Sequence, residues 1–105
     1  MIKKQLLNID INYIDITQVL KSLSDPIRLE IVLSLAKAGT ELSCSKFEYL
    51  GKKSNLSQHY KNLRQNGLIS IRREGLHSYL SLRSEELNRK FPKLIDTIVK
   101  IQTKI

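Results

Sequence analysis

Residues 52–67 read KKSNLSQHYKNLRQNG, and this stretch decides the fold. Leu56, Tyr60 and Leu63 recur at spacings of four and three residues, which puts them on one face of a helix. Most other positions are polar, and an Asn-Gly pair ends the pattern. The spacing therefore predicts an amphipathic helix over about 54–66.

A shorter helix is predicted just before this one. Ser45 and Glu48 have the spacing of a capping box, and Gly51 marks the end of that helix. Ser54 is then a candidate N-cap for the longer helix. Two short helices joined by a tight turn form a helix-turn-helix.

The following residues predict a β-hairpin. Leu68, Ile69 and Ile71 lead into the sequence RREG at 72–75, and residues 76–82 alternate between two faces as in a strand. We therefore expect a hairpin over about 69–82, with basic residues at its tip, which forms the wing of a winged helix-turn-helix.

Two more helices are predicted upstream. Residues 16–23 carry apolar side chains at helical spacing. Asp25 as N-cap and Gly39 beyond the end bracket the next helix, whose apolar residues surround most of its circumference and so predict burial. The opening segment is ambiguous, because Ile9 and Ile11 alternate as in a strand.

Downstream, Ser84 followed by two glutamates predicts another helix, and Pro92 predicts a break before a terminal helix. The expected fold is mainly α: a winged helix-turn-helix with about five helices and a two-stranded hairpin, in a single domain over residues 1–105.

The composition fits one soluble domain. The chain has 105 residues, of which 41% are hydrophobic and 27% charged. We see no signal peptide and no apolar run long enough to span a membrane. A single cysteine leaves no internal disulfide, which favours a reducing cytoplasm.

The net charge of +8 is unevenly distributed. Residues 1–51 carry six basic and six acidic side chains, so they sum to zero. Residues 52–79 carry six basic side chains and one acidic, a net +5, and residues 80–105 add +3 from six and three. A basic patch is typical of a polyanion-binding surface, although a solvated basic face is the alternative.

The helix over 54–66 favours double-stranded DNA as the polyanion. No acidic residue occurs from Lys52 to Arg73, whereas an ordinary surface helix is rich in glutamate. Amide and hydroxyl side chains read base edges in the major groove, and lysines and arginines contact flanking phosphates. Asn62 and Gln65 also count among the outward polar residues of this helix. The predicted DNA contacts are Lys52, Lys53, Ser54, Asn55, Ser57, Gln58, His59, Lys61, Arg64, Arg72, Arg73 and His77.

Three motifs in register resemble the ArsR/SmtB family of bacterial regulators. They are LSDPIRL at 23–29, LSQHYKNLRQNGLI at 56–69, and the wing sequence REG at 73–75 with Tyr79. The similarity covers roughly residues 14–100. It implies a homodimer packed through its first and last helices, and a repressor that leaves its operator when it senses an effector.

The terminal helix supports the dimer independently, because its apolar stripe exceeds what the core of a small domain needs. Completion of the monomer core is the alternative. The predicted dimer-interface residues are Ile16, Val19, Leu20, Leu23, Leu94, Ile95, Ile98 and Ile101.

The sequence departs from the family at its effector sites. Metal-sensing members have Glu-Leu-Cys-x-Cys where residues 41–45 read ELSCS, so serines occupy both ligand positions. The terminal helix lacks histidine, and we predict no metal and no cofactor. Cys44 is a possible redox thiol, although a buried, unreactive cysteine is the commoner case.

Three classes of function differ in what they require of the sequence. The first is an operator-binding regulator, which predicts salt-sensitive binding to an inverted repeat. The second is a winged-helix module that docks on another protein. The third, an enzyme, lacks a glycine-rich phosphate loop, a metal cluster and a nucleophile-base spacing, so no catalytic residue is predicted.

Overall fold

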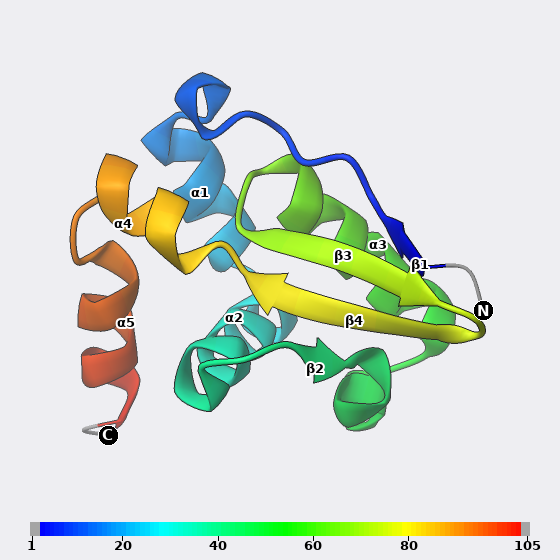
Figure 1. Cartoon of the computed structure of the whole chain (residues 1–105). Coiled ribbons are helices and arrows are strands. Elements are labelled where there is room, and N and C mark those ends of the chain that lie inside the picture. Colours follow the sequence, from blue (N-terminus) through cyan, green and yellow to red (C-terminus); the bar gives the residue numbers. More distant parts are fainter. Residues whose placement is uncertain (1–2, 104–105) are drawn as a thin grey trace.

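The computed structural model describes residues 3–103, which form helices around one small antiparallel sheet (Figure 1). The helices are the 3-10 helix η1 (Ile11–Tyr13), α1 (Ile16–Leu23), α2 (Pro26–Ala38), the 3-10 helix η2 (Cys44–Leu50), α3 (Lys53–Gln65), α4 (Ser84–Lys90) and α5 (Leu94–Thr103). The strands are β1 (Lys3–Gln5), β2 (Leu42–Ser43), β3 (Ile69–Glu74) and β4 (His77–Leu82). The predicted winged helix-turn-helix is confirmed, with η2 and α3 as the helix pair and β3–β4 as the wing.

The sheet has the strand order β1-β3-β4-β2, so two strands join the predicted hairpin. Lys3 lies opposite Glu74 on one edge, and Leu42 lies opposite Leu80 on the other. Both added strands are only two or three residues long, too short for alternation to identify them. Gly75 begins the two-residue turn with φ 61°, a conformation that suits glycine at the first turn position of a hairpin.

The opening segment contains no strand at Ile9 and Ile11. Instead, the Asp10 carboxylate accepts a hydrogen bond from the Asn12 amide at 2.9 Å and caps η1. Alternation of isoleucines was misleading here because Ile11 and Ile14 both turn into the core, a spacing of three residues that belongs to a helical turn.

Two predicted caps are also corrected. The short helix is a 3-10 helix capped by Ser43, whose hydroxyl accepts from the Ser45 amide at 3.2 Å, so Ser45 and Glu48 form no capping box. Helix α3 begins at Lys53, with Lys52 as a cap that offers no side-chain hydrogen bond. The cap of α2 is as predicted: the Asp25 carboxylate accepts from two amides, of Ile27 and Arg28.

Helix α2 lies at the centre of the core, as its apolar circumference predicted. Its buried side chains meet those of α1, η2, α3 and the wing in one cluster. The fully buried members include Val19, Ile31, Val32, Leu35, Phe47, Leu63, Leu68, Ile69, Leu80 and Leu87. This core holds α3 and the wing in fixed relation, and thereby positions the polar face of α3.

Three basic side chains fasten the segment between β1 and α1 to the rest of the domain. Arg64 Nη1 donates to the Leu7 carbonyl at 2.8 Å, and Arg83 Nη1 donates to the Ile9 carbonyl at 2.7 Å. Lys90 Nζ donates to the Ile11 carbonyl at 3.0 Å. Part of the basic charge therefore has a structural role.

Within the described residues, none of the helices combines the length and apolarity that crossing a bilayer requires.

Candidate nucleic-acid interface

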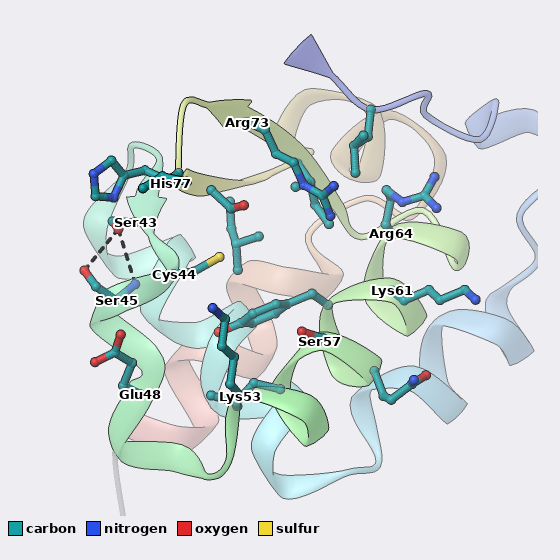
Figure 2. Close-up of a pocket in the computed structure, with 18 of the residues that line it drawn as sticks. Ser43, Cys44, Ser45, Glu48, Lys53, Ser57, Lys61, Arg64, Arg73 and His77 are labelled. Carbon is teal, nitrogen blue, oxygen red and sulfur yellow. Dashed lines mark hydrogen bonds between the residues drawn. The ribbon is translucent and has the colours of Figure 1, made fainter. Parts of the chain in front are cut away.

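The polar face of α3 is open to solvent. Leu56 and Leu63 anchor the opposite face in the core, at 3% and 0% exposure. The exposed residues of the predicted DNA-contact set are Lys52, Lys53, Ser54, Asn55, Ser57, Gln58 and Lys61 on or beside this helix, with Arg73 and His77 on the wing. Arg73 on the wing and Lys61 on α3 line the same hollow between the two elements (Figure 2).

Two polar residues of α3, at the edge of this face, are held by side chains of α1 and α2. His59 Nδ1 lies 3.3 Å from Arg28 Nη1 and 4.0 Å from the Asp25 carboxylate, at the start of α2. Asn62 Oδ1 accepts a hydrogen bond from the buried Ser22 hydroxyl at 2.7 Å. The structure places both beside α1 and α2, because helical geometry brings positions 59, 62 and 66 onto the flank that contacts those helices.

Arg28 was missed by the sequence reasoning. Its guanidinium donates from Nε to the Ser22 carbonyl at 2.7 Å. Arg28 also borders a shallow polar depression, whose other lining residues are Gln58, His59, Lys61, Asn62 and Gln65. The sequence offered no signal for this, because Arg28 lies in α2 and reaches the α3 surface only through tertiary packing.

Arg72 and Arg73 point in different directions. Arg72 forms ion pairs with Glu41 at 2.7 Å and Glu74 at 2.5 Å, and its guanidinium lies 4.4 Å from the centroid of the Tyr79 ring. Hydrogen bonds with Glu41 and Glu74 raise the pKa of Arg72. The Arg72 charge is therefore neutralised within the sheet, whereas Arg73 is exposed on the other face. Both lie on β3, short of the tip where they were expected.

Arg64 is only half-exposed, since its guanidinium holds the Leu7 carbonyl. Arg64 therefore borders the face while its guanidinium is engaged with the backbone of the N-terminal segment.

The region of the family's metal motif is built from hydroxyls. Ser45 Oγ donates to Ser43 Oγ at 3.0 Å, and across residues 3–103 no three histidine, cysteine or acidic side chains form a metal-binding group. Burial raises the pKa of the Cys44 thiol, more than the neighbouring Tyr60 hydroxyl and Arg73 charge lower it. A thiol with a raised pKa lacks the thiolate character of a redox sensor, so the redox alternative is not favoured.

The predicted dimer residues divide into three groups. Val19 and Leu23 are buried in the core of the single chain, so they offer almost no surface to a partner. Ile16, Leu20 and Ile101 are 42%, 50% and 57% exposed. The remaining three are partly buried against the same core: Leu94, Ile95 and Ile98.

A helix-turn-helix, an adjoining hairpin and an acid-free polar helix face define the class of winged-helix DNA-binding proteins. Comparison with known proteins narrows this class. The chain is 36% identical over 86 residues to the uncharacterized HTH-type transcriptional regulator YceK of Bacillus subtilis (77% of this chain, 83% of YceK). It is also 36% identical over 78 residues to the arsenical resistance operon repressor of Staphylococcus xylosus (73% of this chain, 74% of that protein).

The fold is shared with solved structures of HlyU from Vibrio cholerae N16961. One has a TM-score of 0.68 at 27% identity, covering 82% of this chain and 89% of HlyU. Reduced HlyU has a TM-score of 0.59 at 28% identity, covering 72% and 87%. No protein-family model matches the sequence. The chain belongs to the ArsR-type family of winged helix-turn-helix transcriptional regulators, as the resemblance implied.

Proposed function

We propose that the protein is a homodimeric repressor that reads an inverted-repeat operator with α3 and contacts phosphates through the wing. The observation that carries this proposal is the exposed face of α3, where Ser57, Gln58 and Lys61 present hydrogen-bonding groups without an acidic neighbour on the helix. Amides and hydroxyls at this position match the base-edge code of the major groove. Repression is suggested by the name of the Staphylococcus relative.

The wing supplies a phosphate contact through Arg73. Arg73 is exposed and lines the same hollow as residues of α3, and phosphate contacts orient a protein on DNA without reading sequence. Lys52 and Lys53, at the start of α3, are further candidates for phosphate contacts.

The dimer is proposed from the exposed apolar side chains of α1 and α5. Ile16 and Leu20 lie on one face of α1, and Ile101 lies on α5. Burying these side chains against a second copy removes apolar surface from water, and a two-fold pairing sets two α3 helices against successive major grooves. A regulator of this kind works where the chromosome is, so we propose a cytoplasmic location.

Selection of bound sequences from random DNA tests the function. We expect an inverted repeat with half-sites about one helical turn apart, 10–10.5 base pairs. Sedimentation of the free protein should give a dimer, and L20E should shift it to monomer, with T40E at an exposed position after α2 as the control for the added negative charge. Equal affinity for scrambled DNA would contradict sequence reading, and little binding to any DNA would favour a protein-docking module.

A further inference from the structure

A cavity of about 670 Å³ lies between α3, η2 and the wing (Figure 2). This volume is within the range of small-molecule sites. Its rim is basic: Lys53, Lys61 and Arg64 come from α3, and Arg73 comes from the wing. Glu48 is the only acidic residue in its lining, so a bound anion meets several positive charges and one negative charge.

The floor of the cavity is apolar. Leu56, Ile71 and Leu80 line it and are 3%, 6% and 0% exposed. Leu76, at the turn of the wing, also borders the cavity and is fully exposed, so it adds apolar surface at the cavity edge. An apolar floor below a basic rim suits a ligand with an apolar body and a negative group.

The Tyr60 hydroxyl marks the place for a polar atom. It lines the cavity, its oxygen is buried, and among the described residues no oxygen or nitrogen atom hydrogen-bonds it; its neighbour is the Cys44 thiol, a weak hydrogen-bonding group. A buried hydroxyl whose neighbour is only a weakly hydrogen-bonding thiol costs free energy that a ligand acceptor would recover. Cys44 lies next to it, and the positive charge of Arg73 reaches the same thiol. Tyr60 on α3 and Arg73 on the wing both line the cavity, so two different elements bring these side chains to it.

We propose that this cavity binds an amphipathic organic anion, whose carboxylate lies between Arg73 and the Tyr60 hydroxyl and whose apolar body lies against Leu56, Ile71 and Leu80. The role of this anion as an effector rests on the proposed DNA-binding function. Lys61 and Arg73 belong to the DNA-contact face, so a bound carboxylate neutralises charge there and obstructs the approach of phosphates.

Calorimetric titration of the DNA-free protein tests binding. Three probes separate the contribution of the carboxylate from that of the apolar chain. Octanoate has both groups, acetate has the carboxylate alone, and octylammonium has the apolar chain with a positive charge. We expect octanoate to bind at least about tenfold more tightly than either, because only octanoate uses the floor and the rim together. Equal binding of octanoate and octylammonium would overturn the proposal.

Variants test the position of the carboxylate. R73Q should lower octanoate affinity about tenfold, and Y60F should lower it severalfold while keeping the ring in the core. R89Q, on the exposed side of α4, should leave octanoate affinity unchanged. If R73Q and Y60F both bind octanoate as the parent protein does, the site is elsewhere and the proposal fails.

The effector role is tested separately with the selected operator. Saturating octanoate should weaken operator binding at least fivefold in the parent protein, whereas acetate at the same ionic strength should not. Octanoate binding without any effect on operator affinity would refute regulation through this cavity. Because the titration uses no DNA, failure of the DNA-binding function leaves its result unaffected.

Discussion

The recognition helix α3 and the wing are the two basic regions of the interface, yet they use their charge differently. On α3, Lys53 and Lys61 are exposed, as the sequence suggests. On the wing, the neighbours Arg72 and Arg73 point to opposite faces, and two glutamates neutralise Arg72. A helix displays a broad polar face, whereas a strand turns every second side chain to the other face of the sheet. Counting charges therefore overestimates the DNA-facing charge of the wing.

Gly67 joins the two regions and carries the largest expected effect. Its φ is 80°, and a Cβ there would lie 2.8 Å from Ile14 Cγ1. We expect G67A to lower the free energy of unfolding by about 2–3 kcal/mol, from backbone strain and overpacking together. Urea denaturation measures it. G39A, with φ 68° and nothing within 4 Å, should show the strain alone, about 1 kcal/mol. Equal losses of unfolding free energy in G67A and G39A would show that Ile14 can move aside to accept a methyl group at position 67.

On the helix side, Q58A should weaken binding to the selected operator by about 10- to 100-fold, since a bidentate amide contact to a base discriminates by about 1–3 kcal/mol. Binding to random DNA should change less than about twofold. Fluorescence anisotropy with both DNAs measures this. A uniform loss on both DNAs would assign Gln58 to the phosphate backbone.

On the wing, R73Q and R72Q should have different effects: R73Q on DNA binding, and R72Q on thermal stability. R73Q should weaken operator and random DNA alike, about fivefold, and lower the slope of log affinity against log salt by about 0.9. R72Q should leave that slope unchanged and lower the thermal midpoint, because it removes the ion pairs with Glu41 and Glu74. A reduced salt slope in R72Q would contradict the division of the two arginines.

The smallest expected effect is on stability in acid and concerns Asp25, the N-cap of α2, whose carboxylate lies 4.0 Å from His59 Nδ1 on α3. Burial acts to raise the pKa of Asp25, but hydrogen bonds from the Arg28 and Ile27 amides outweigh it and hold the pKa below its ordinary value of 3.8. Because the folded-state pKa is depressed, this stability is present above pH 3.8 and is lost as pH falls through the folded pKa. D25N keeps the cap without the charge, so its unfolding free energy should decline less steeply with acid. If the unfolding free energies of D25N and the parent protein fall in parallel with pH, the Asp25 charge does not contribute to stability.

Much of the fold could be predicted because its signals are local. Helix α2 combines an acidic N-cap, a proline and a terminal glycine with an apolar circumference, and α3 combines an apolar stripe with an Asn-Gly end. The edge strands β1 and β2 could not be predicted, since each forms only by pairing with a wing strand distant in sequence. The same limit applies to Ser43, whose capping role depends on where the 3-10 helix begins.

The sequence by itself determined the class of protein: the order of elements, the acid-free polar face of α3 and the family motifs all follow from residue spacing. Only the tertiary structure decided which charges face outward. It directs His59 and Asn62 toward α1 and α2, neutralises Arg72, uses Arg64 to hold the N-terminal segment, and buries Val19 and Leu23 within the monomer. The physical reason is that local patterns specify helices and turns, whereas a partner for a side chain comes from another element, brought near by packing of the core.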